Sequence, residues 1–427
     1  LVGSEMCIRD RHTSRAGAKV ALLLKRGVDI PNPLSLDIGD DVRVDRISAS
    51  GVTLYPGCRI RGEKTVISAG SKLGHEAPAT VENCRLGSGV ELKGGFFSNS
   101  VFLEKASMGM GAHVREGTLL EEQSGGAHCV GLKQTILFPF VTLGSLVNFC
   151  DCLMAGGTSR QNHSEVGSSY IHFNFTPDAD KATPSLIGDV PRGVMLNQPP
   201  IFLGGQGGLV GPSCLGYGNV VAAGCILRGD YPEGNRLIRP PASPGAVKDF
   251  IAAAYPGFTR IVENNLLYLA NLAALDAWYR EVRKPFLEAQ EFGPLLFAGV
   301  MDQLDLARKE RARRLEEMAE KAATDVPAGQ PPAAARARRE FREHVRVVTG
   351  VFQERTRSDA TERLRDAFLE DFRKAAGEDR RDYIAAIQGL PAEVSAGGVR
   401  WLGSLVEDLC ARAARVVPSM NLFRNPA

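Results

Sequence analysis

An aliphatic residue recurs at every sixth position between Leu203 and Leu227. Leu209, Leu215 and Val221 fill the intervening steps, and glycines crowd the stretches between them. An α-helix repeats every 3.6 residues and a half-buried strand every two, so neither explains a strict period of six. Hexapeptide periods are typical of β-helices, in which each unit buries its apolar residue only by stacking on its neighbours. Three such units complete one triangular coil, so residues three hexapeptides apart should lie above one another.

The same rhythm starts near Ser35 and continues, with interruptions, to the run just described. Its apolar steps upstream are Leu54, Ile60 and Val66, then Leu86 and Leu92, then Met108, Val114 and Leu120, and finally Leu132 and Phe138. The stretch "TPDADKATP" at 176–184 breaks the period, and we expect it to form a loop at one corner. The sequence therefore predicts a parallel β-helix of hexapeptide repeats over residues 35–235.

The second half of the chain has a different composition, which begins at the linker "RPPASPG". The apolar spacing beyond it predicts a helical region over 245–322, a linker over 323–336 and a C-terminal helical bundle over 337–427. The basic run "RKERARR" is read as a solvated helix face. The predicted fold class is therefore α+β, a β-helix followed by an all-α region.

The N-terminal segment has two parts. Residues 1–11 resemble a translated sequencing adapter, and we exclude them from the fold as a scar. The next segment, "RAGAKVALLLKRG", predicts a short amphipathic helix over 15–27. Gly27 closes this helix, and the prolines of "IPNP" prevent its continuation.

Composition excludes several classes of function. The 51 basic and 49 acidic side chains of the 427 residues nearly cancel, so nucleic acid is not an expected partner. Nine cysteines in so long a chain favour reduced thiols in a cytoplasmic protein over a disulfide scaffold. Cys150 and Cys152 have no second pair at ligand spacing, so no metal site is expected. The sequence also contains no apolar run long enough for a membrane span.

Two cations are candidates for a ligand site. The interval from Arg115 to Lys133 equals three hexapeptides, which places them in one column on adjacent coils if the coils are regular. Arginine offers a planar fork of donors and lysine a point charge, so the pair could hold a phosphate. Two solvated surface cations would give the same pattern, and that alternative stays open.

The segment "AHVREGTLLEEQSGGAHCVGLK", which contains both cations, resembles a known family without gaps. It is similar to the sugar-phosphate-binding stretch in the C-terminal β-helix of bifunctional UDP-N-acetylglucosamine pyrophosphorylase/glucosamine-1-phosphate N-acetyltransferase. The wider block from "GLKQTILFPF" to "HFNFTP" resembles bacterial proteins usually named UDP-N-acetylglucosamine pyrophosphorylase-like. The resemblance covers 35–235, and it implies a left-handed β-helix, a homotrimer with its site between subunits, and acetyl-CoA as co-substrate.

The same resemblance implies roles for individual residues. "HFNFTPDADKATPSLIGD" looks like the family's loop that contacts both substrates. By that match, Asn174 and Phe175 stand where the family contacts acetyl-CoA. Lys181 stands with Arg115 and Lys133 where it contacts the sugar phosphate.

The sequence departs from the family in two ways. No Gly-rich loop follows an N-terminal strand, so we expect the nucleotidyltransferase domain to be absent and no pyrophosphorylase activity. The family's general-base histidine is also missing. Extending the gapless match puts Ser145 at its position, and Asn148 where a tyrosine is expected.

Two other histidines could supply the base. His163 follows Ser145 by three hexapeptides, which would place it one coil further along the same column. Histidine can remove an ammonium proton near neutral pH, so His163 is the candidate base, with Glu165 as its orienting partner. His172 is the second choice, although its aromatic flanks favour an inward or stacked ring. A purely structural role remains the alternative for both.

The sequence thus supports three hypotheses about function. The first is an acetyl-CoA-dependent N-acetyltransferase that acts on a sugar phosphate or nucleotide sugar. The second is a non-catalytic sensor of nucleotide sugars, which keeps the cations, has lost the base and binds a protein partner through its helical half. The third is a trimeric scaffold that uses neither feature.

Overall fold

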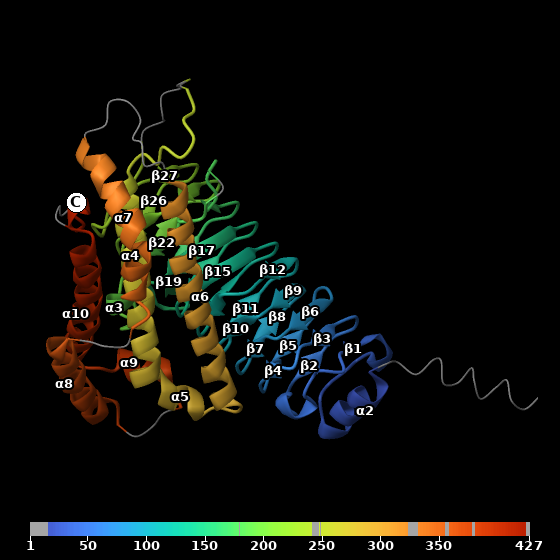
Figure 1. Ribbon diagram of the computed structural model, residues 1–427. Helices are drawn as coiled ribbons and strands as arrows, with labels where there is room; N and C mark the ends of the chain where they lie inside the picture. Colours follow the sequence, from blue (N-terminus) through green and yellow to red (C-terminus); the bar gives the residue numbers. More distant parts are fainter. Residues whose placement is uncertain are drawn as a thin grey trace, which may run out of the picture.

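The computed structural model of the chain describes residues 16–178, 180–240, 247, 249–322, 332–354, 358–377 and 381–423. The predicted scar at 1–11 lies outside these residues. The described residues form a parallel β-solenoid, drawn from blue to green in Figure 1, and a group of helices beside its C-terminal coils.

The solenoid is triangular, and each coil supplies short strands to its three faces. The first face contains β1 (Asp37–Ile38), β3 (Arg59–Arg61), β6 (Ala79–Glu82), β9 (Gly95–Ser98), β12 (Ala112–Val114), the first halves of β15 (Gly131–Leu137) and β17 (Asn148–Met154), β21 (Ile171–Phe173), β24 (Gly208–Val210) and β27 (Ile226–Arg228). The second face contains β4 (Val66–Ile67), β7 (Arg85–Leu86), β10 (Ser100–Phe102), β13 (Thr118–Leu120), the second halves of β15 and β17, β22 (Ser185–Ile187) and β25 (Ser213–Leu215).

The third face is a separate ten-stranded sheet. Its strands are β2 (Thr53–Leu54), β5 (Lys72–Leu73), β8 (Glu91–Leu92), β11 (Ser107–Met108), β14 (Gly125–Gly126), β16 (Thr142–Leu143), β20 (Glu165–Val166), β23 (Phe202–Leu203), β26 (Val220–Val221) and β28 (Leu237–Ile238). We call the corner between the first and second faces the first corner. The second corner joins the second and third faces, and the third corner joins the third and first.

The apolar residues of the hexapeptide repeat point into the solenoid. Leu203, Leu209, Leu215, Val221 and Leu227 are at most 3% exposed. Burying an aliphatic side chain of this size contributes about 1.5–3 kcal/mol, so the repeat that predicts the coil also stabilises it. The predicted fold class, a β-helix followed by an all-α region, is confirmed.

The first corner is turned by residues in the left-handed region of backbone space. Asn83, Asn99, Gln134 and Asp151 have φ angles of 51°, 46°, 51° and 62°. Short amide and carboxylate side chains tolerate this conformation because they can hydrogen-bond locally. Between Asn99 and Gln134 the corner is turned by Gly117, with φ of 76°. The first corner therefore presents a column of amide and acid side chains.

Helix α2 (Gly17–Arg26) covers the N-terminal end of the solenoid (Figure 1). Val20 and Leu23 are buried in the apolar core. Lys19 Nζ donates hydrogen bonds to the carbonyl oxygens of residues 39, 40 and 42 at 2.8–2.9 Å. The helix is thus fixed to the first coil by apolar packing and by three polar contacts.

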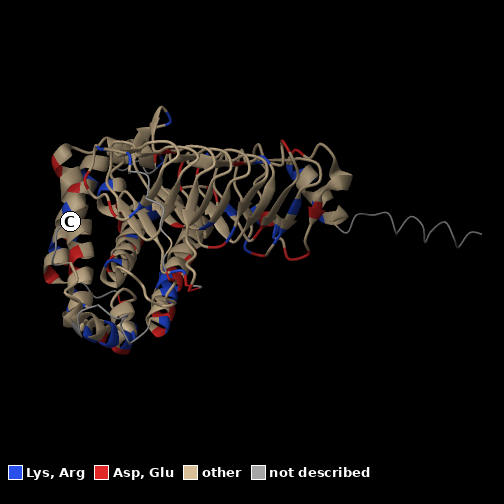
Figure 2. Ribbon diagram, turned by 90° about the horizontal axis from the view of Figure 1, so that it is seen from above, with Lys and Arg blue, Asp and Glu red and all other residues tan. Residues whose placement is uncertain are grey.

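The helical half covers the second face of the solenoid. Its helices are α4 (Phe258–Trp278), which continues into a π-helical turn (Tyr279–Arg283), α5 (Lys284–Glu288), α6 (Gly293–Lys321), α7 (Pro332–Gly350), α8 (Asp359–Ala376), α9 (Tyr383–Gln388) and α10 (Ala392–Val416). Helix α6 packs along β7, β10 and β13, and α4 packs on β22 and on the short α3 (Val190–Gly193). Figure 2 shows both signs of charge mixed over these helices.

The C-terminal boundary of the predicted linker is wrong. Residues 323–331 of the predicted linker 323–336 lie outside the described residues, but α7 begins at Pro332. Proline is favoured in the first turn of a helix, and the alanines that follow it are the strongest helix formers. The helix therefore starts before the predicted boundary at 337.

A buried ionic cluster joins the helical half to the second corner. Arg283 donates to Glu122 at 2.5 Å and lies 3.7 Å from the centre of the Tyr383 ring. The Tyr279 hydroxyl donates to Glu121, which is also buried. Burial raises the pKa of Glu121 to about 7, and the nearby carboxylate of Glu122 acts in the same direction. Arg283 therefore neutralises Glu122, while Glu121 keeps its proton at mildly acidic pH.

Candidate functional site

The structure places the two predicted cations side by side at the first corner. The amide of Arg115 donates to the carbonyl oxygen of Leu132 at 2.9 Å, and Lys133 pairs in register with Cys150 on the next coil. Arg115, Lys133 and Cys150 therefore form one column. One regular coil joins Val114 to its partner Leu132, and the next coil, from Leu132 to Phe149, is a single position shorter.

The loop at 174–184 returns to the same corner and brings Lys181 with it. Burial raises the pKa of the Cys150 thiol, and the negative charge of Asp151 adds to this effect. The charges of Arg115, Lys181 and Lys133 act in the opposite direction on the same thiol. All three predicted phosphate ligands therefore lie within electrostatic reach of one point.

A residue of the helical half holds this loop in place. Arg311 of α6 forms an ion pair of 2.7 Å with Asp151, and both side chains are buried. Arg311 also donates to the carbonyl oxygen of Lys181 at 3.1 Å. Asp151 in turn accepts from the Asn174 amide at 3.0 Å. Sequence reasoning missed Arg311, because nothing in the sequence shows where α6 packs on the solenoid.

A groove of about 520 Å³ crosses the first face from the third corner to this column. We call it the first-face groove. Arg115 and Cys150 line one end, and Gly131 lies between His113 and Asn148 in the middle. A side chain added at Gly131 would point toward Asn148, whose side-chain oxygen Oδ1 would lie 3.4 Å from the new Cβ. The missing side chain therefore leaves room for a ligand.

A histidine and a serine lie next to the other end of the groove. Cys129 and Leu146 line this end at the third corner. The residues directly before them, His128 and Ser145, are joined by a hydrogen bond of 2.9 Å between His128 Nδ1 and Ser145 Oγ. Ser145 is the residue that the gapless extension predicts at the family's base position, and the structure places His128 beside it, one coil earlier. The sequence signal for His128 was its spacing from Ser145, which equals one shortened coil.

The predicted column of Ser145 and His163 is wrong. Leu143 pairs with Val166, which is further along the chain than a regular coil would reach. The coil is longer because it includes a hairpin at the second corner, formed by β18 (Gly157–Ser159) and β19 (Asn162–His163). There His163 Nδ1 contacts the carbonyl oxygen of Arg160 at 2.8 Å, and its Nε2 lies 3.9 Å from Glu165. The structure therefore brings His163 and Glu165 together, but at a different corner from the three cations.

The second candidate base, His172, lies inside the solenoid. It is 3% exposed, and its two ring nitrogens contact the carbonyl oxygen of Cys150 at 2.5 Å and the hydroxyl of Ser185 at 2.8 Å. Burial lowers the pKa of His172 to about 4. The expected inward ring is present, and both nitrogens are engaged away from the groove.

The two residues expected to contact acetyl-CoA lie on the loop beside the column. The Asn174 amide is held by Asp151, whereas the Phe175 ring is 65% exposed. Phe173, in the column just above Cys150, is also exposed. The end of β21 and the loop after it therefore present two aromatic rings to solvent next to the cations.

Lys133 faces away from the first-face groove. Its Nζ forms an ion pair of 2.7 Å with Glu116, and both residues line a second cavity, between the first corner and α6. Burial acts to raise the pKa of Glu116, but the hydrogen bond from Lys133, a backbone hydrogen bond and the charges of Lys133 and Arg115 together lower this pKa. Arg115 and Lys133 are thus adjacent along the column but line different cavities.

The described residues contain no group of three or more His, Cys, Asp or Glu side chains arranged to hold a metal ion. In the same part of the chain, no helix combines the length and apolar character that a membrane crossing requires.

Comparison with known proteins gives relatives for half of the chain, although no family model matches it. The protein named bifunctional protein GlmU of Thermotoga maritima is 26% identical over 215 residues, which are 50% of this chain and 42% of that protein. GlmU of Trichlorobacter lovleyi is 28% identical over 217 residues, and GlmU of Synechococcus elongatus is 25% identical over 208 residues. These matches cover 51% and 49% of this chain, and 42% and 40% of the two relatives.

The chain therefore spans about two fifths of the length of the curated relatives it matches. The match and the β-solenoid together confirm the resemblance predicted from the sequence. About half of this chain is homologous to the bifunctional GlmU proteins, and its solenoid resembles their C-terminal β-helix.

Proposed function

We propose that this chain is an acyltransferase that moves an acetyl group from acetyl-CoA to the amine of a phosphorylated amino sugar in the first-face groove. The observation that carries the proposal is the arrangement of the groove. It has the His128–Ser145 pair beside one end and Arg115, with the charges of Lys133 and Lys181, at the other. A base beside one end of the groove and a cation at the other end suit a substrate that carries both an amine and a phosphate.

The length of the groove is compatible with such a substrate. The extended chain from Cys129 to Lys133 spans on the order of 13 Å. His128 lies beside one end of the groove, and Arg115 lines the other end. An amine and a phosphate a few ångström apart in one sugar can then be held at the same time.

His128 would act as the general base. With the proton on Nδ1 donated to Ser145, Nε2 keeps a free lone pair that can take a proton from the substrate ammonium group. The amine nitrogen then forms a bond to the acetyl carbonyl carbon, and the carbon–sulfur bond breaks. The nitrogen loses two protons in all, one from the ammonium group before attack and one as the amide forms. The imidazole delivers one of them to the departing thiolate and the other passes to solvent, so the proton count balances.

The groove and its rim fit an acyl thioester. Acetyl-CoA would supply an activated acetyl group attached to a long, largely apolar arm. The exposed rings of Phe173 and Phe175 offer an apolar surface for that arm beside the cations. Asn174, whose side-chain amide is held by Asp151, would orient the acetyl end of that arm. The predicted roles of Asn174, Phe175 and Lys181 remain part of this proposal, whereas His128 replaces His163 as the candidate base.

The assembly that we propose is a homotrimer. Helices of the same chain cover the second face, but the C-terminal coils expose Ile171 and Ile226 on the first face and Phe202, Val220 and Leu237 on the third. These two apolar strips flank the third corner. A threefold arrangement can bury one strip of each subunit against the other strip of its neighbour. The predicted protein partner of the helical half and the cytoplasmic location remain predictions.

The test is a transfer assay with glucosamine 1-phosphate and acetyl-CoA. The acetylated product should be measured by mass spectrometry rather than with a thiol reagent, because the chain has nine cysteines. Removing a general base lowers the turnover number by about 10²–10⁴-fold, and we expect this loss for His128→Ala. His163→Ala is the matched control and should keep the turnover of the unmodified chain.

Three results would contradict the proposal in different ways. A loss of turnover in His163→Ala but not in His128→Ala would restore the original candidate base. Binding of UDP-N-acetylglucosamine without any acetyl transfer would replace the enzyme with the nucleotide-sugar sensor. Absence of both binding and transfer would leave the scaffold.

A further inference from the structure

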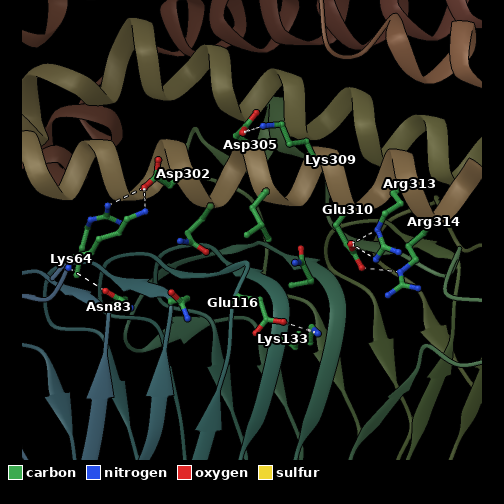
Figure 3. A pocket seen from close by; sticks show the side chains of 15 residues that line it. Lys64, Asn83, Glu116, Lys133, Asp302, Asp305, Lys309, Glu310, Arg313 and Arg314 are labelled. Atoms are coloured by element: carbon green, nitrogen blue, oxygen red, sulfur yellow. Dashed lines mark hydrogen bonds and ion pairs between the residues drawn. The ribbon is translucent and has the colours of Figure 1, made fainter. Parts of the chain in front are cut away.

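A second cavity separates the first corner of the solenoid from helix α6 (Figure 3). Its volume is about 610 Å³, within the range of pockets that hold small molecules. Lys64, Asn83, Glu116 and Lys133 line it from the solenoid, and side chains from Asp302 to Arg314 of α6 line the opposite wall. We call this cavity the α6 cleft.

The α6 cleft is polar and its lining has an excess of positive charge. Six Lys or Arg and four Asp or Glu residues line it. Asp302 is shared by Arg85 at 2.9 Å and Lys64 at 3.8 Å. Glu310 is shared by Arg313 at 2.6 Å and Arg314 at 2.8 Å.

Each of these two carboxylates therefore serves two cations. Glu317, just outside the lining, also pairs with both Arg313 and Arg314. The excess of positive charge therefore belongs to the solenoid wall, where three cations face the single carboxylate of Glu116. On the α6 wall three cations are matched by three carboxylates.

A buried amide supplies an independent sign of a ligand. Gln134 lines the cleft, is 6% exposed, and lies directly over Gly117. Its side-chain oxygen has no hydrogen-bond partner among the described residues. The neighbouring Gln303 of α6 is also buried, but its oxygen accepts from the Gly117 amide at 2.9 Å. A buried carbonyl without a donor is rare in proteins, and a ligand with an N–H or O–H group would satisfy it.

We propose that the α6 cleft binds a phosphorylated sugar, either as a monophosphate or within a nucleotide sugar, at a site separate from the first-face groove. The phosphate would interact with Lys133 and with the paired Arg313 and Arg314, which bind phosphate oxygens through forked donors. Lys64 lies at the other end of the cleft, beside Asp302 (Figure 3). A hydroxyl or amide of the sugar would donate to Gln134. The proposal does not depend on acetyl transfer, because half of the lining belongs to α6 and none of it is the His128–Ser145 pair.

The placement of Lys133 connects the cleft with the first-face groove. Lys133 lies next to Arg115 in the column, one coil further along the chain. Its ammonium group, however, is held by Glu116 on the cleft side. A dianionic phosphate competes with the single charge of Glu116 for this ammonium group. The occupied cleft would therefore keep Lys133 on the α6 side of the corner and leave Arg115 and Lys181 to the groove.

The test is a calorimetric titration of the full chain with glucosamine 1-phosphate, UDP-N-acetylglucosamine and inorganic phosphate in separate arms. Two variants separate the sites. Arg313→Gln/Arg314→Gln removes charge from the cleft, and Gln134→Met removes the buried acceptor without changing its length. Arg363→Gln/Lys374→Gln on α8 removes the same charge at another place, and Lys374 has an equivalent helical pair with Glu370. Thermal unfolding checks that each variant is folded.

We expect a binding event that persists in Arg115→Ala/His128→Ala, weakens at least tenfold in Arg313→Gln/Arg314→Gln, and is unchanged in the α8 control. Gln134→Met should weaken binding of the sugar-containing probes but not of inorganic phosphate. The probe that binds with the higher affinity shows whether the ligand is a monophosphate or a nucleotide sugar. Loss of all binding in Arg115→Ala/His128→Ala, or equal affinity in the cleft variant and the α8 control, would overturn the proposal. Loss of acetyl transfer alone would leave it intact.

Discussion

Arg311 in the helical half and Asp151 in the solenoid form an ion pair of 2.7 Å in which each side chain is at most 5% exposed. Asp151 turns the first corner with a φ of 62° and also holds Asn174, while Arg311 holds the carbonyl oxygen of Lys181. The loop that carries three predicted ligand-binding residues is therefore anchored by one arginine from the other half of the chain. The helical half is part of the candidate site and not an independent appendage.

Breaking this pair from one side should destabilise the protein strongly. Arg311→Met leaves the carboxylate of Asp151 buried and unpaired, and such changes lower the free energy of unfolding by about 3–5 kcal/mol. Asp151→Asn is the matched partner variant, because asparagine tolerates the left-handed backbone of this corner. The free energies should be measured by urea denaturation of both single variants and the double variant. The double variant should lose less stability than the sum of the two, and simple additivity would show that the pair is not coupled.

Filling the first-face groove should block binding without disturbing the core. Leu132 points inward and its neighbour Gly131 outward, so Gly131→Leu places its side chain in the groove between His113 and Asn148. We expect at least a tenfold loss of affinity for glucosamine 1-phosphate in the groove, measured by calorimetry, and little change in the melting temperature. Gly131→Ala is the control, since its Cβ meets only the Asn148 side chain at ordinary contact distance. An unaltered affinity in Gly131→Leu would move the substrate away from this groove.

Ser145 is expected to orient His128 and not to carry the acetyl group. Ser145→Ala removes the partner of Nδ1 but keeps the imidazole. The turnover number should then fall by about tenfold or less, compared with the 10²–10⁴-fold expected when the base itself is removed. Steady-state kinetics of both variants provide the comparison. A complete loss in Ser145→Ala, together with a covalent acetyl adduct on the unmodified chain, would instead indicate a serine nucleophile.

The buried cluster at the second corner should make stability depend on pH. The pKa of Glu121 is raised from 4.5 to about 7, chiefly by burial, so the folded protein keeps a proton that the unfolded chain releases above pH 4.5. The folded state then binds more protons between about pH 4.5 and 7, and the free energy of unfolding falls as the pH rises through this window. The loss amounts to at most about 3 kcal/mol at 1.36 kcal/mol per pH unit.

Glu121→Gln isolates this effect, because the amide cannot titrate and can still accept from Tyr279. The urea midpoint of the unmodified chain, relative to that of the variant, should decrease between pH 5 and 7. The titration of buried His172 cancels in this difference, since it is present in both proteins. Parallel pH profiles for the two proteins would show that Glu121 is ionised throughout.

The hexapeptide period predicted the solenoid because burial of every sixth residue is a local property of the sequence. The buried positions between Leu203 and Leu227 could be predicted without knowing any distant contact. The column of Arg115 and Lys133 followed for the same reason, from one regular coil. Prediction failed where a coil changed length. The shortened coil brought His128 to Ser145, and the hairpin at the second corner moved His163 away from it.

The contributions of the helical half could not be predicted from the sequence. Arg311 and the lining of the α6 cleft depend on how α6 packs on the second face, and amphipathic spacing gives a helix without giving its partner. The basic run that contains Arg311, Arg313 and Arg314 was read as a solvated helix face. Arg313 is half-exposed, as expected for such a face, but Arg311 is buried in the junction between the two halves.

Helix α2 also determines where the stack of coils ends. The outermost coil of a parallel solenoid carries a row of backbone amide and carbonyl groups that could pair with another chain. Lys19 occupies three of the carbonyl oxygens near this edge, and the apolar side of α2 covers the core behind them. A chain without this cap would present an unpaired edge to its copies. The short helix thus prevents the edge of the solenoid from pairing with further copies of the chain in a fibre.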